Sequence, residues 1–182
     1  MDMARRGTPQ PDAVDLMLEQ WRRERPDVDT SPLGVFGRLH RSFNRYQNQL
    51  TKLFDSYDLS MAGFGLLAAL RRLGAPYRCT AGQLADTILL STGGITQRVD
   101  KLETAGLVRR DRDPVDRRVV YVELTDKGLA LIDEVAAAHF ANEARMLSGL
   151  TQSEQAQLAK LLSRLEHSLD LAEMSANSST GT

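Results

Sequence analysis

Apolar residues recur at steps of three and four positions along most of this chain, which is the spacing that places them on one face of an α-helix. The chain is therefore predicted to be mainly helical. We expect helices over residues 12–24, 32–57, 61–73, 80–89, 91–104, 126–147 and 151–169. Residues 107–124 follow a different pattern, with two short β-type runs on either side of a charged turn, which predicts a hairpin.

Local start signals support several of these helices. Thr80 and Gln83 have the form of a capping box, in which a hydroxyl and a side chain three residues later each bind the other residue's backbone N–H, and Thr151 and Glu154 have the same form. Asp12 is the expected N-cap of the first helix.

The order of these elements predicts a winged helix-turn-helix, a fold that is mainly α with a small β-hairpin as its wing. The helix over 91–104 would then be free to lie in the major groove of DNA, which is wide enough for one α-helix. Ile95, Val99 and Leu102 share one face of this helix and are expected to pack inward. The candidate DNA contacts on the rest of the helix are Ser91, Thr92, Gly93, Thr96, Gln97, Arg98 and Lys101.

These candidates have chemical reasons to contact DNA. The first residues of the helix lie where free backbone N–H groups can hold a phosphate. Gly93 and Gly94 have no side chain, which allows the backbone to approach DNA closely. Gln97 carries an amide suited to an adenine edge, and Arg98 can reach a guanine edge or a phosphate.

Arginines also gather in the predicted hairpin, at Arg109, Arg110, Arg112, Arg117 and Arg118. Their planar guanidinium groups fit phosphates and narrow minor grooves. We expect Asp116 to pair with Arg118 and to aim it at the minor groove. The wing's candidate DNA contacts are therefore Arg112, Asp116, Arg117 and Arg118. Without the preceding helix-turn-helix, the charged hairpin could equally be a solvent-exposed surface that binds nothing.

The net charge of the chain is nearly zero, but basic and acidic residues are unevenly distributed along it. The 182 residues carry a formal net charge of -1, which excludes a globally basic nucleic-acid coat. Residues 91–121 hold 7 basic and 5 acidic side chains, whereas residues 122–182 hold 4 and 9. Because salt screens charges beyond roughly 10 Å, one basic face can bind a polyanion although the whole chain is nearly neutral.

Composition also bounds the chemistry. No apolar run approaches the roughly 20 residues that span a bilayer, and no apolar signal region opens the chain, so we expect a soluble cytoplasmic protein with no membrane partner. The single cysteine, Cys79, excludes a disulfide framework, and the histidines lack metal-ligand spacing, so no metal and no cofactor are expected. We find no catalytic motif and do not expect an enzyme.

A motif that spans the hairpin points to a family. It consists of Asp-x-Arg, a short β run and Leu-Thr-x-x-Gly, found here at Asp116, Arg118, Leu124, Thr125 and Gly128. Residues 32–170 resemble the MarR family of bacterial transcription regulators. The resemblance implies a homodimeric, ligand-responsive regulator, most often a repressor, whose two recognition helices bind a pseudo-palindromic site in double-stranded DNA.

The same resemblance implies how the chain is divided. The expected parts are a disordered arm over 1–11, an extra helix and loop over 12–30, a helical dimerisation region over 31–58 and 126–172, a DNA-binding domain over 59–125 and a disordered tail over 173–182.

The N-terminal helix resembles the extra helix of the urate-responsive subgroup of that family. Trp21 matches the subgroup's ligand-binding tryptophan and Arg72 its arginine, whereas Gly65 stands where the subgroup has an aspartate. The resemblance implies a small anionic or aromatic effector bound by Trp21 and Arg72. From the residues alone, Trp21 could instead anchor its helix to the core, and Arg72 could be a solvated helix end.

Two other functional classes stay open. The fold could serve as a protein-interaction module without DNA function, although Arg117 and Arg118 argue against that reading. A small hydrolase is the third hypothesis, opposed by the missing motifs. Cys79 could be a redox-sensing thiol or inert packing.

Overall fold

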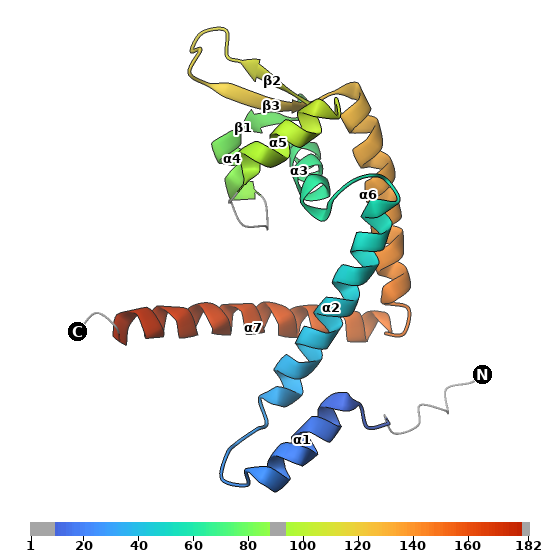
Figure 1. The fold of residues 1–182 in the computed structure, drawn as a ribbon, viewed down its shortest axis with the longest axis vertical. Coiled ribbons are helices and arrows are strands. Elements are labelled where there is room, and N and C mark those ends of the chain that lie inside the picture. The colour runs from blue at the N-terminus through green and yellow to red at the C-terminus, as the bar shows by residue number, and fades with distance from the viewer. Residues whose placement is uncertain (1–9, 88–93, 180–182) are drawn as a thin grey trace. The chain divides into compact units, whose positions relative to one another are not determined.

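The structure is a computed structural model, and it describes residues 10–87 and 94–179. The chain divides into two units, Met1–Leu129 and Ala130–Thr182. The elements, labelled in Figure 1, are α1 (Ala13–Glu24), α2 (Leu33–Asp55), α3 (Met61–Arg72), β1 (Arg78–Thr80), α4 (Ala81–Thr87), α5 (Ile95–Thr104), β2 (Val108–Arg112), β3 (Val120–Leu124), α6 (Asp126–Met146) and α7 (Gln152–Ser179). The fold is mostly helical with a small antiparallel sheet, as the pattern predicts.

The predicted helix starts are present. The Asp12 side chain accepts hydrogen bonds from the backbone N–H groups of Val14 and Asp15, and Asp15 returns the bond to the Asp12 backbone. At α4 the N–H of Thr80 donates to Gln83 Oε1 at 3.0 Å, and the N–H of Gln83 donates to Thr80 Oγ1 at 3.2 Å. A matching pair of bonds joins Thr151 and Glu154 at the start of α7.

Three strands form the sheet, in the order β1-β3-β2. The predicted hairpin supplies β2 and β3, which pair from Val108 opposite Leu124 to Arg112 opposite Val120. The sequence pattern did not predict β1, in which Cys79 lies opposite Val122. Three residues are too few to show an alternating pattern, and this strand exists because β3 offers it a free edge.

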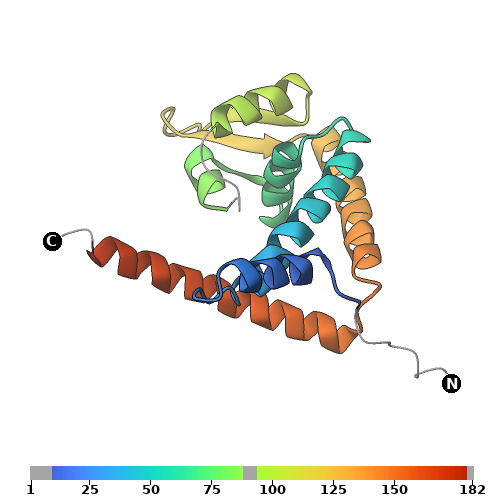
Figure 2. The same cartoon turned by 60° about the horizontal axis from the view of Figure 1, so that its bottom comes forward.

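The core of the first unit lies between α3, α5 and the sheet. Leu66, Leu67 and Leu70 of α3 are fully buried, together with Val99 of α5 and Val122 of β3. Figures 1 and 2 both show α5 lying beside the β2–β3 hairpin, and contacts join the two elements. This packing fixes the hairpin relative to the helix.

The hairpin leads into α6 through a tight junction. The Thr125 hydroxyl donates to the Gly106 carbonyl at 2.7 Å and accepts from the Gly128 N–H at 3.0 Å. Thr125 thus caps α6 and ties it to the turn before β2. A Cβ atom on Gly128 would lie 1.9 Å from the Leu107 carbonyl oxygen, so the close approach requires glycine.

The helix start predicted at Ser91 lies outside the described residues. Within them, Gly94 has a φ of 85° and α5 begins at Ile95, because a left-handed residue cannot continue a right-handed helix. The tail predicted to be disordered from residue 173 is instead helical as far as Ser179. Glycine and proline are absent from this stretch, and the Ser175 hydroxyl donates to the Leu171 carbonyl inside the helix.

The second unit consists of α7 and most of α6. Ile132 and Val135 of α6 are fully buried, whereas α7 exposes a series of apolar side chains, namely Leu158, Leu161, Leu162, Leu169, Leu171 and Met174. None of the helices in the described residues combines the length and the apolar character needed to cross a bilayer.

Candidate nucleic-acid interface

The predicted helix-turn-helix is formed by α4 and α5. Leu84 of α4 is fully buried, and α4 contacts α3, α5 and the sheet, so it can support its partner helix. The joint between the two helices falls at residues 88–93. The predicted contacts Ser91, Thr92 and Gly93 therefore lie outside the described residues.

The described part of α5 has the two faces that the pattern predicts. Ile95, Val99 and Leu102 are buried. Thr96, Gln97 and Lys101 are exposed, and Arg98 is half-buried. A helix that is anchored by one apolar stripe and presents polar side chains opposite to it is suited to reading a DNA groove.

Arg110 differs from the other hairpin arginines because it is paired with α5. Its guanidinium forms ion pairs with Asp100, at 2.5 Å, and with Glu103, both on α5. The Arg110 N–H also donates to Glu103 Oε1 at 3.0 Å. Hydrogen bonding to the Asp100 carboxylate is the main cause that raises the Arg110 pKa above its ordinary value. We define the wing as β2, β3 and the turn between them. Arg110 joins α5 to this wing.

The remaining wing arginines divide into two groups. Arg109 pairs with Glu123 across the hairpin at 2.9 Å. Arg112, Arg117 and Arg118 are exposed, and their guanidinium groups make no ion pair or hydrogen bond with any part of the chain that the structure describes. Within the described chain, the wing arginines without a charge partner are therefore those nearest the wing turn.

The expected pairing of Asp116 with Arg118 was wrong in its geometry. Asp116 accepts a hydrogen bond from the Arg118 backbone N–H at 3.0 Å, and no bond joins it to that guanidinium among the described residues. A carboxylate two residues before an N–H closes a local turn more readily than it reaches the end of a long side chain. Asp116 thus shapes the backbone under Arg118 and leaves the cation free.

Asp113 is a residue that the sequence reasoning missed. Its carboxylate accepts bonds from the N–H groups of Val115 and Asp116 at 2.8 and 2.9 Å, and from the Tyr121 hydroxyl at 3.3 Å. The backbone bond from Asp116 is the main cause that lowers the Asp113 pKa. Arg78 of β1 lies over the Tyr121 ring at 4.7 Å from its centroid. An aspartate directly before Pro114 is the turn signal that could have revealed this role.

The predicted effector residues lie on exposed surfaces. Trp21 on α1 is 50% exposed, and Arg72 ends α3 in an exposed position. In the described chain, neither side chain lines the pocket between Asp12 and Arg45 or the pocket formed by Phe36, Leu39, His40 and Phe43. Cys79 is only 5% exposed, and burial raises the pKa of its thiol, which opposes the reactive thiolate that a redox sensor needs.

A helix-turn-helix joined to a basic hairpin defines a winged-helix protein of the DNA-binding class. Comparison with known proteins is consistent with this class, because the model of the MarR family matches residues 57–119. The chain also shares 41% identity over 156 residues with the HTH-type transcriptional regulator PecS of Dickeya dadantii, covering 86% of this chain and 94% of that protein. The chain therefore belongs to the MarR family of transcriptional regulators, and its relatives are named as regulators, not as enzymes.

Solved structures show the same fold. AbsC, a MarR family transcriptional regulator from Streptomyces coelicolor, is 28% identical and aligns with a TM-score of 0.66 over 79% of this chain and 96% of its own. BpsR of Bordetella bronchiseptica, whose DNA binding is regulated by 6-hydroxynicotinic acid, is 25% identical, with a TM-score of 0.64 over 72% of this chain and 92% of its own.

Proposed function

We propose that this protein is a cytoplasmic, homodimeric repressor of transcription that binds a pseudo-palindromic site in double-stranded DNA and is released by a small effector. The observation that carries the proposal is the combination of two surfaces in the first unit. One is the exposed polar face of α5, and the other is the set of wing cations Arg112, Arg117 and Arg118, which have no charge partner within residues 10–87 and 94–179.

The two surfaces suit the two grooves. In the proposed complex α5 lies in the major groove, where the Gln97 amide can bind an adenine edge and Arg98 a guanine edge or a phosphate. Ser91, Thr92 and Gly93 precede this face, and Thr96 and Lys101 flank it. Arg118 enters the adjacent minor groove, whose negative potential attracts guanidinium groups. Asp116 contributes by setting the backbone turn beneath Arg118.

Dimerisation is supported by apolar surface that the described chain leaves in solvent. Phe36, Leu39 and Phe43 on α2 are exposed and, with His40, line a pocket of about 480 Å³. The exposed leucines of α7 form a second apolar series. Large exposed apolar surfaces mark interaction sites, and a second copy of the chain is the occupant that family membership favours. Such a dimer would read two half-sites about one helical turn apart, roughly 34–36 Å.

We further propose that the effector is a small anionic or aromatic molecule bound near Trp21 and Arg72. The half-exposed indole offers a stacking surface and the guanidinium offers a charge partner. BpsR, which responds to an aromatic acid, provides a precedent within the fold. The effector can release DNA only if it binds one dimer geometry more tightly than the other.

A salt titration on DNA taken from upstream of the protein's own gene tests this function. Steep loss of affinity with rising salt, together with a residual preference for one sequence, is expected if the wing arginines neutralise phosphates. Absence of binding at low salt would instead favour the interaction-module hypothesis.

A further inference from the structure

A pocket of about 290 Å³ lies where the start of α1 meets α2, outside the surfaces assigned so far. It is lined by polar residues, namely Asp12, Arg38, Arg41, Ser42 and Arg45. Helices α1 and α2 are in contact in the first unit, so the pocket is formed within that unit. Three guanidinium groups and one carboxylate, that of Asp12, therefore border this pocket.

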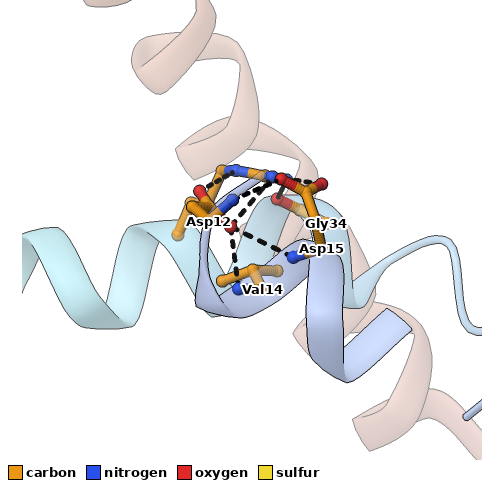
Figure 3. A network of polar contacts seen from close by, with 5 residues as sticks. Asp12, Val14, Asp15 and Gly34 are labelled. Carbon is orange, nitrogen blue, oxygen red and sulfur yellow. Dashed lines mark hydrogen bonds and ion pairs between the residues drawn. The ribbon is translucent and has the colours of Figure 1, made fainter. Parts of the chain in front are cut away.

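The first of these arginines is fixed by the protein itself. Arg38 Nε donates to Asp12 Oδ2 at 2.9 Å, its Nη2 donates to Asp15 Oδ1 at 2.7 Å, and its Nη1 donates to the Gly34 carbonyl at 3.0 Å. Figure 3 shows how this network gathers the start of α1 against α2. Hydrogen bonding to Asp15 and then Asp12 raises the Arg38 pKa. Two carboxylates compensate this cation and hold it against the start of α1 at one side of the pocket.

The other two arginines have no such compensation. Arg41 and Arg45 are four residues apart on α2 and therefore project from the same face of the helix. Both are exposed, and neither makes an ion pair or hydrogen bond with the rest of the chain, as far as the structure describes it. Ser42, between them, adds a hydroxyl to the same pocket. The site thus offers two free guanidinium groups and one neutral donor.

We propose that this pocket binds a small phosphate-bearing molecule. A single carboxylate is satisfied by one guanidinium group, so it would neutralise only one of the two arginines, Arg41 and Arg45. A phosphate group carries close to two negative charges and three acceptor oxygens, so Arg41, Arg45 and Ser42 can all share it. The fixed Arg38–Asp12 pair makes the wall of the site preorganised, which limits the entropy lost on binding.

The site is separate from the one proposed for the effector. Asp12 caps the start of α1, and Trp21 lies nine residues further on, roughly 14 Å along the helix axis. The phosphate site goes beyond the proposed function, because it can be occupied whether or not the chain binds DNA. It also makes α1, through its Arg38 network, a candidate element for sensing that ligand.

Isothermal titration calorimetry of the full chain tests the proposal, with inorganic phosphate as the probe in a buffer free of phosphate and sulfate. Acetate serves as the carboxylate control. We expect saturable binding of phosphate with one site per chain and at least about tenfold weaker binding of acetate. The double variant Arg41→Gln/Arg45→Gln should bind phosphate at least about tenfold more weakly than the wild type.

Lys52→Gln is the matched control, since it removes one exposed cation from the same helix outside the pocket. It should bind phosphate as the wild type does. The proposal is overturned if phosphate shows no saturable binding, if acetate binds equally well, or if the double variant retains wild-type affinity. Circular dichroism and sedimentation of each variant establish that the fold and the oligomeric state are unchanged. Because no DNA is present, these results are independent of the proposed DNA-binding function.

Discussion

The backbone at Gly128 lies so close to the carbonyl oxygen of Leu107 that a Cβ atom on residue 128 would stand 1.9 Å from it. This contact fixes the first turn of α6 against the residue that precedes β2. The glycine of the family motif is thus explained by the space available at the end of the wing, and the Thr125 hydroxyl, bonded to Gly106 and Gly128, holds the same junction from the other side.

We predict that Gly128→Ala destabilises the protein by more than about 2 kcal/mol, because the Leu107 carbonyl belongs to the backbone and can move only with the wing. Urea denaturation followed by circular dichroism measures the change. Gly82→Ala is the matched control: Gly82 is also in the first turn of a helix, but its added Cβ would meet Thr80 Oγ1 only at 3.9 Å, an ordinary van der Waals distance. That variant should gain roughly 0.5–1 kcal/mol from helix propensity. An equal loss of stability in both variants would contradict this explanation.

Two arginines of the wing allow a direct comparison. Arg118→Ala is predicted to weaken DNA binding roughly tenfold and to lower the salt slope by about one, because a free guanidinium is lost from the groove. Arg109→Ala should have a much smaller effect, since Arg109 is already paired with Glu123. Fluorescence anisotropy on the same duplex gives both affinities. Both variants should keep the wild-type fold and dimer, and equal affinities for the two would refute the role of Arg118 in the minor groove.

Arg110 is predicted to affect DNA binding without contacting DNA. Arg110→Gln should reduce affinity because it releases the recognition helix from the wing, while the slope of affinity against salt stays at the wild-type value. The double variant Asp100→Asn/Glu103→Gln removes the same link from the other side and should reproduce the loss. A loss confined to the arginine variant, together with a lower salt slope, would mean that Arg110 binds phosphate itself.

Trp21 is the only tryptophan in the chain, so its fluorescence reports on the proposed effector site. We expect 6-hydroxynicotinate, an aromatic acid, to quench this fluorescence in a saturable manner and acetate to leave it unchanged. The Arg72→Ala variant should lose the saturable quenching, because the charge partner of the acid is missing. If the indole signal of the wild type does not respond, or if the variant responds equally, the assignment of the effector site to Trp21 and Arg72 is wrong.

Features with local causes were predictable from the sequence. The capping pairs Thr80–Gln83 and Thr151–Glu154 are formed by residues three positions apart, and the buried stripe of α5 follows from helical periodicity alone. The hairpin was equally predictable, because its two β-type runs and the charged turn between them are adjacent in the chain. These local signals were enough to define the winged helix-turn-helix.

Features with distant causes were not predictable. The five wing arginines look alike in sequence, and only the fold shows that Arg109 and Arg110 meet carboxylates from β3 and α5. Strand β1 depends on an edge of β3 more than 40 residues away. The position of Gly94 in left-handed backbone, which sets the start of α5, also could not be distinguished from a glycine inside a helix.

Hydrogen–deuterium exchange of the full chain, with and without the bound DNA duplex, tests most directly whether α5 and the wing both contact DNA. Bound DNA should slow exchange in peptides that cover Ile95–Thr104 and in those that cover the turn between Arg112 and Val120. The contrary result is a duplex that binds at low salt and slows exchange elsewhere in the chain, while both of these segments exchange as they do in the free protein.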